Sequence, residues 1–146
     1  MKMAHGFLMA GCLLPAGLMA HDEVGNLDQS NWGLVKEAPI EVCMPTGQRE
    51  YLERLICPGQ EHPLFVRAGN VGPRAPLPEN GSEAELLMIV LSMPTAEPLA
   101  EGAADHHWID AYEVDCGGEK TMVYMDMYHC DAPPPTAAPA GFMLKN

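Results

Sequence analysis

The side chains best suited to chemistry in this chain are thioethers and imidazoles near its C-terminal end. In the run Thr-Met-Val-Tyr-Met-Asp-Met-Tyr-His-Cys, Met125, Met127 and His129 occupy alternate positions and would share one face of a strand. Sulfur and imidazole ligands on one face suit a soft copper ion. Methionines on a strand face are more often core residues, so the run predicts a buried strand first and a copper site as the alternative.

A second possible copper site involves His21, which becomes the N-terminal residue if a signal segment is removed after Ala20. A terminal histidine can chelate copper through its amine and Nδ1, and His106 or His107 could add a third nitrogen. This arrangement is similar to the histidine brace of copper-dependent polysaccharide oxygenases and periplasmic copper carriers. Those families are β-sandwiches, whereas this chain is expected to contain two helices, so the resemblance is confined to these histidines.

Acidic residues and imidazoles also gather in the last third of the chain, as they do in hydrolases. The residues concerned are Asp105, His106, His107, Asp110, Glu113, Asp115 and Asp126. However, the sequence contains no G-x-S-x-G nucleophile motif, no H-E-x-x-H zinc motif and no G-x-G-x-x-G nucleotide loop. We therefore expect a protein that is not an enzyme and that has no cofactor, with copper as the cofactor of the alternative interpretation.

Residues 1–20 have the features of a secretory signal segment. Lys2 precedes a short apolar stretch that includes Leu13 and Leu14, and small and apolar residues follow Pro15. The stretch is too short to span a bilayer. Met-Ala-Gly-Cys, ending at Cys12, resembles a bacterial lipoprotein cleavage box, but only eleven residues precede this cysteine, so we favour cleavage after Ala20. The expected location is the periplasm or the extracellular space.

Removal of this segment leaves four cysteines, which predict two disulfides: Cys43, Cys57, Cys116 and Cys130. If residues 108–130 form a hairpin, Cys116 and Cys130 lie roughly 30 Å apart, too far for a bridge. A bridge between Cys43 and Cys57 would have to span a helix of roughly 15 Å. The pairing is therefore expected to be crossed between the two halves of the chain, with both crossed combinations open.

The patterning predicts an α+β fold in which a small antiparallel sheet of three to four strands packs with two helices. The helices are expected at about 47–56, capped by Thr46, and at about 83–93, where Ser82 and Glu85 form a capping box. The strands are expected near 38–43, near 63–68 and in the hairpin 108–130, whose turn would be 117–120. That turn places six apolar residues on one face: Trp108, Tyr112, Val114, Val123, Met125 and Met127.

The chain divides into a signal segment (1–20), a flexible arm (21–37), one globular domain (38–130) and a tail rich in proline and alanine (131–146). Its net charge of −12 disfavours nucleic acids, which bind through lysine and arginine, and it favours cationic partners. We expect a small exported binding module, for example an inhibitor or an immunity-type protein, that recognises a basic protein. The alternative is a periplasmic copper-binding protein.

Overall fold

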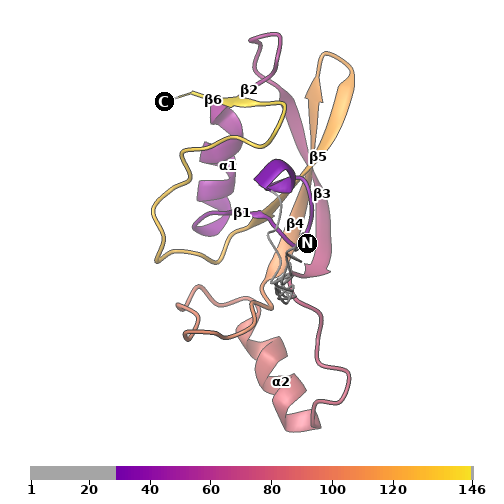
Figure 1. Ribbon diagram of the computed structural model, residues 1–146, viewed down its shortest axis with the longest axis vertical. Coiled ribbons are helices and arrows are strands. Elements are labelled where there is room, and N and C mark those ends of the chain that lie inside the picture. The colour runs from indigo at the N-terminus through magenta and orange to yellow at the C-terminus, as the bar shows by residue number, and fades with distance from the viewer. Residues whose placement is uncertain (1–28, 146) are drawn as a thin grey trace, which may run out of the picture.

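A four-stranded mixed sheet forms the centre of the fold, with strand order β1-β5-β4-β3 (Figure 1). The computed structural model describes residues 29–145. The strands of this sheet are β1 (Ile40–Glu41), β3 (Leu64–Pro73), β4 (Trp108–Cys116) and β5 (Glu119–Asp126). The helices are α1 (Met44–Arg54) and α2 (Glu83–Ser92), and a short 3-10 helix covers Gln29–Asn31. The predicted α+β class is confirmed, although β1 pairs with β5 in parallel rather than antiparallel.

The β4–β5 hairpin is present, but its turn is shorter than predicted. Cys116 pairs with Glu119, and only Gly117 and Gly118 form the turn, both with positive φ values (67° and 100°) that a two-residue turn of this kind requires. The predicted pairing of Cys116 with Thr121 is therefore wrong by two residues. Because the shift is even, each side chain keeps its predicted face.

Helix α1 covers one face of the sheet. It begins at Met44, three residues earlier than predicted, because Pro45 fits the first turn and Cys43 rather than Thr46 is the N-cap. It ends at Arg54, two residues earlier than predicted. Between α1 and the sheet lies a core of buried side chains: Ile40, Val42, Tyr51, Leu52, Leu55, Val114, Val123 and Met125. Tyr112 and Met127 pack against this core, as the predicted apolar face requires.

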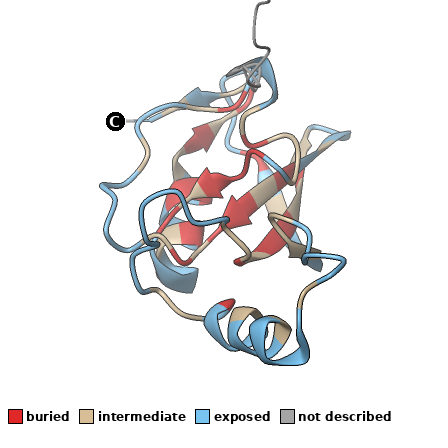
Figure 2. Ribbon diagram, turned by 60° about the horizontal axis from the view of Figure 1, so that its bottom comes forward, coloured by how far each residue is buried: buried red, intermediate tan, exposed pale blue. Residues whose placement is uncertain are grey.

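Helix α2 does not pack on the sheet, contrary to prediction. Its bounds agree with the sequence analysis, and the Ser82 hydroxyl accepts the predicted capping hydrogen bond from the Glu85 N–H (3.3 Å). None of its ten residues is buried, and it stands apart below the sheet (Figures 1 and 2). Six consecutive apolar residues, 86–91, give this helix no single apolar face with which to cover a sheet.

Two disulfides connect the halves of the chain in the crossed manner that was predicted. Cys43 bonds to Cys130, and Cys57 bonds to Cys116. The first joins the N-terminus of α1 to the segment after β5. The second joins the segment after β2 (Leu55–Ile56) to the end of β4.

The segments on either side of the predicted domain also contact it. Trp32 packs against the core, and Gly33 accepts a hydrogen bond from the Tyr124 N–H through its carbonyl (2.9 Å). The tail returns across α1, where the Tyr51 hydroxyl donates to the Ala137 carbonyl (2.8 Å), and its strand β6 (Met143–Leu144) pairs with β2. Residues 29–37 and 131–145 thus pack on the domain instead of extending from it, because they bury Trp32 and Phe142 against the core.

Candidate functional site

Two histidines and two aspartates meet at the end of the sheet where β4 begins and β5 ends. The ligand-type atoms of Asp105, His107, Asp126 and His129 all lie within 4.8 Å of one another. We call these four residues the His–Asp cluster. Asp105 and His107 precede β4, whereas Asp126 and His129 lie at and just after the end of β5, so the hairpin brings the two pairs together.

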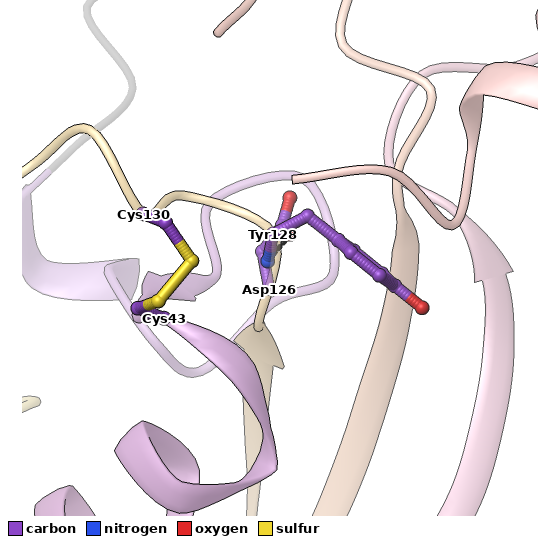
Figure 3. Close-up of a disulfide and its surroundings, with 4 residues drawn as sticks. All are labelled: Cys43, Asp126, Tyr128 and Cys130. Carbon is purple, nitrogen blue, oxygen red and sulfur yellow. Dashed lines mark hydrogen bonds between the residues drawn. A yellow bond between two sulfur atoms is a disulfide. The ribbon is translucent and has the colours of Figure 1, made fainter. Parts of the chain in front are cut away.

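Strand register places Asp126 in the cluster. Its neighbour Met125 points into the core, so Asp126 points to the other face, beside Glu41 of β1. The Asp126 side chain is completely buried. Its Oδ1 accepts a hydrogen bond from the Tyr128 N–H (3.1 Å; Figure 3), which leaves Oδ2 directed at the two imidazoles.

The disulfide Cys43–Cys130 fixes the segment that carries His129 (Figure 3). The His129 N–H donates to the Val42 carbonyl (3.1 Å), and Cys43 and Tyr128 form an isolated β-bridge. The His129 backbone is thus held on both sides by contacts with the residues that lead into α1.

Asp105 and His107 lie where the chain returns to the sheet after α2. We call residues 76–104 the excursion, because they leave the sheet after β3 and return before β4. Two hydrogen bonds hold its ends together, from the Arg74 N–H to the His107 carbonyl (2.9 Å) and from the Ala75 N–H to the Asp105 carbonyl (2.8 Å). The cluster therefore lies at the base of the excursion.

Within the cluster, each imidazole faces both carboxylates. His129 Nε2 lies 3.1 Å from Asp105 Oδ2 and 3.2 Å from Asp126 Oδ2. His107 Nδ1 lies 2.9 Å from Asp105 Oδ1 and 3.6 Å from Asp126 Oδ2. Arg74 adds a further contact to Asp105 Oδ2 (2.9 Å) and also pairs with Glu41.

These contacts shift the pKa values of the four groups. Burial alone would raise the pKa of both aspartates, but the neighbouring imidazoles and backbone N–H groups hold the pKa of Asp105 and of Asp126 below the usual range. Burial acts to lower the pKa of His107, but the two carboxylates outweigh it and raise that pKa to about 9. Hydrogen bonds with the same carboxylates raise the pKa of His129 to about 10.

The cluster contains part of each group of residues that the sequence analysis singled out. His129 belongs to it, whereas Met125 lies in the core and Met127 packs against the core. His107 also belongs to it, but the His106 Nδ1 lies against the Ala75 carbonyl (3.1 Å) instead. His21 lies outside the described residues. Asp105 and Asp126 are in the cluster.

The other predicted acidic residues lie elsewhere. Asp110 is buried on the α1 side of the sheet, Glu113 pairs with Lys120, and Asp115 accepts the Gly118 N–H in the hairpin turn.

Sequence reasoning divided the cluster among three hypotheses. His129 was grouped with methionines, His107 with His21, and the two aspartates, again with His107, with a hydrolase-like set. A usable signal was present. Asp105 and His107 are two residues apart, Asp126 and His129 are three apart, and continuation of the hairpin pairing beyond its strands brings 105–107 opposite 128–130.

The second unusual feature of the molecule is the apolar surface of α2. Four large apolar side chains are strongly exposed: Leu87 (57%), Met88 (67%), Val90 (44%) and Leu91 (60%). Soluble monomers seldom expose contiguous apolar side chains in this way, and such a surface usually marks an interaction site. The surrounding excursion contains no lysine, arginine or histidine. It contains five glutamates: Glu79, Glu83, Glu85, Glu97 and Glu101. The excursion therefore combines exposed apolar side chains with a net negative charge.

In comparisons with known proteins, no family model, no curated protein and no solved structure matches the chain. Within residues 29–145, neither helix has the length and apolar character needed to cross a membrane. The two disulfides fit an extracellular or periplasmic protein, since such bonds persist in oxidising compartments.

Proposed function

We propose that this protein is an exported binding module that inserts the apolar helix α2 into a groove of another protein. The observation that carries the proposal is the exposure of Leu87, Met88, Val90 and Leu91 on helix α2, none of whose residues is buried. Insertion of a helix into an apolar groove is a common mode of protein recognition. It would remove these side chains from water at no cost to the fold of the domain.

Charge indicates what kind of partner fits. The excursion that contains α2 has five glutamates and no compensating base, so a groove with a basic border complements it. Two copies of α2 would bring like charges together, and anionic lipid would be repelled. Helices that lie on membranes are typically rich in lysine and arginine, which α2 lacks. We therefore propose a basic protein as the partner, and an inhibitor that caps a basic enzyme would be one example.

Site-specific photo-crosslinking in the compartment to which the chain is exported tests this proposal. A photoreactive amino acid replaces Met88, and as a control it replaces Glu119, the exposed first residue of β5. We expect position 88, but not 119, to crosslink one basic protein. Crosslinks to lipid or to a second copy of the chain, or the absence of any crosslink specific to position 88, would contradict the proposal.

The identified partner then permits a quantitative comparison. Leu87→Glu should weaken binding at least tenfold, because it places a charge inside the apolar contact. Leu64→Glu is the matched control, since Leu64 is also strongly exposed (77%) but lies on β3. Higher salt should slow association, because the glutamates attract the basic border. Equal effects of the two substitutions would show that α2 is not the contact surface.

A further inference from the structure

The buried imidazole of His107 has an unsatisfied nitrogen. The side chain is 4% exposed, and within residues 29–145 its Nδ1 has no hydrogen-bond partner. The distance to Asp105 Oδ1 is only 2.9 Å, but the N–H direction is too far from this oxygen for a hydrogen bond. A buried polar atom without a partner destabilises a fold, so its position needs a reason.

The geometry of the His–Asp cluster supplies a reason. In a tetrahedral zinc site with bonds of about 2.0 Å, neighbouring ligand atoms lie about 3.3 Å apart. The four imidazole-to-carboxylate distances, measured to both oxygens of Asp105 and to Oδ2 of Asp126, range from 2.9 to 3.6 Å, and one ligand atom from each residue lies within 4.8 Å of the others. The Nδ1 of His107 thus lies among the ligand-type atoms of the cluster without a hydrogen-bond acceptor of its own among the described residues.

We propose that Asp105, His107, Asp126 and His129 bind one divalent first-row transition-metal ion of the zinc class. Two carboxylates balance the charge of such an ion, and two imidazoles, each of which would release its proton on binding, complete a set of four nitrogen and oxygen ligands. The cluster contains no sulfur, which distinguishes it from a site for Cu(I).

Surrounding contacts would orient these ligands as outer partners do in metal sites. Asp126 Oδ1 is held by the Tyr128 N–H, and Asp105 Oδ1 accepts the His107 N–H (2.9 Å). Arg74 contacts Asp105, and Glu41 offsets the charge of Arg74. Because Asp105 and His107 end the excursion whereas Asp126 and His129 follow β5, a bound ion would connect the base of the excursion to the sheet.

Metal titration of the exported and processed protein tests the site. The protein is stripped with a chelator and dialysed. Zn²⁺ binding is followed by calorimetry, and Co²⁺ binding by its ligand-field absorption, which distinguishes four-coordinate from six-coordinate ions. We expect one Zn²⁺ per chain and a four-coordinate Co²⁺ spectrum. Absence of saturable one-to-one Zn²⁺ binding to the unaltered protein would overturn the proposal and leave the cluster as an ion-pair network.

Variants assign the ligands. His107→Gln and His129→Gln should each weaken Zn²⁺ binding by about 100-fold or more, since loss of an outer partner alone costs about 10- to 100-fold. His106→Gln is the matched control next to the cluster, and His21→Ala removes the separate candidate at the predicted mature N-terminus. Circular dichroism confirms that each variant is folded. Binding that survives both His→Gln changes, or that is lost only in His21→Ala, would refute the assignment.

Discussion

The buried carboxylate of Asp110 in β4, on the core side of the sheet, connects this strand to β3 and to α1 through side-chain hydrogen bonds. Asp110 is 4% exposed and accepts two hydrogen bonds from Arg67 of β3 (2.6 and 3.0 Å). It also accepts one from Gln48 of α1 (3.2 Å), and the Tyr112 hydroxyl donates to the other end of Gln48 (2.9 Å). The network satisfies polar groups that would otherwise be buried without partners.

Replacement of Asp110 therefore has a defined cost. Asp110→Ala leaves the buried Gln48 amide without its acceptor and removes the ion pair of Arg67, so the free energy of unfolding should fall by about 1–3 kcal/mol. Urea denaturation of the oxidised protein measures this change. Lys120→Ala removes the solvent-exposed pair with Glu113 and should have no measurable effect. Similar midpoints for wild type and Asp110→Ala would contradict the role given to this network.

At the scale of elements, α2 is stabilised by contacts at its two ends, whereas none of the side chains along the helix is buried. Ser82 caps its first turn, where Glu83 and Glu85 also favour the helix dipole, and Met93 just after it is 1% exposed. A ten-residue helix is too short to be stable alone in water. We expect α2 to open locally, without unfolding of the sheet, as weakly packed elements do.

Hydrogen exchange resolves this local opening. Amides of α2 should exchange much faster than those of β4 and β5, and Ser82→Ala should accelerate α2 exchange about fivefold, because an N-cap contributes about 1 kcal/mol. The sheet amides should be unaffected. Ser92→Ala, at the other end of the same helix, is the control, since the Ser92 hydroxyl donates to the Ile89 carbonyl and does not cap the first turn. Acceleration of the whole chain by Ser82→Ala would mean that α2 unfolds together with the sheet.

The elements were largely predictable because they depend on local signals, but their placement was not. Ser82 with Glu85 predicted the start of α2, and alternation along β4 and β5 predicted the buried face. The hairpin register differed because Gly117-Gly118 alone completes the turn, a choice between two plausible loop lengths. The exposed position of α2 had no local signal, since an apolar run is compatible with burial on any side.

The difference between local signals and tertiary placement also explains how much of the candidate site could be predicted from the sequence. His107 and His129 were singled out by residue type. Their association with Asp105 and Asp126 depends on the hairpin register and on the bond between Cys43 and Cys130. The crossed disulfide pattern followed from distances along the hairpin, but the choice between the two crossed pairings depends on the tertiary fold.

Across the whole molecule, the two disulfides cross-link the chain over similar spans but border different features. The bond between Cys43 and Cys130 joins residues 87 positions apart and lies next to His129, whereas that between Cys57 and Cys116 spans 59 positions and lies at the end of β4. Loop-closure entropy depends only weakly on length, so both should stabilise the fold by a similar amount. Removal of each disulfide in turn can therefore separate an effect on the free energy of unfolding from an effect on the geometry of the His–Asp cluster.

Replacement of either pair by serine should lower the free energy of unfolding by about 2–5 kcal/mol, measured by denaturant titration of the metal-free proteins. Zn²⁺ affinity should respond differently. Without the Cys43–Cys130 bond, the segment that carries His129 is held to Val42 by backbone hydrogen bonds alone, so binding should weaken by about tenfold or more. Without the Cys57–Cys116 bond, a folded protein should retain its affinity, because no residue of the His–Asp cluster adjoins that bond. Equal losses in the two variants would mean that the cluster depends on overall stability and not on the placement of His129.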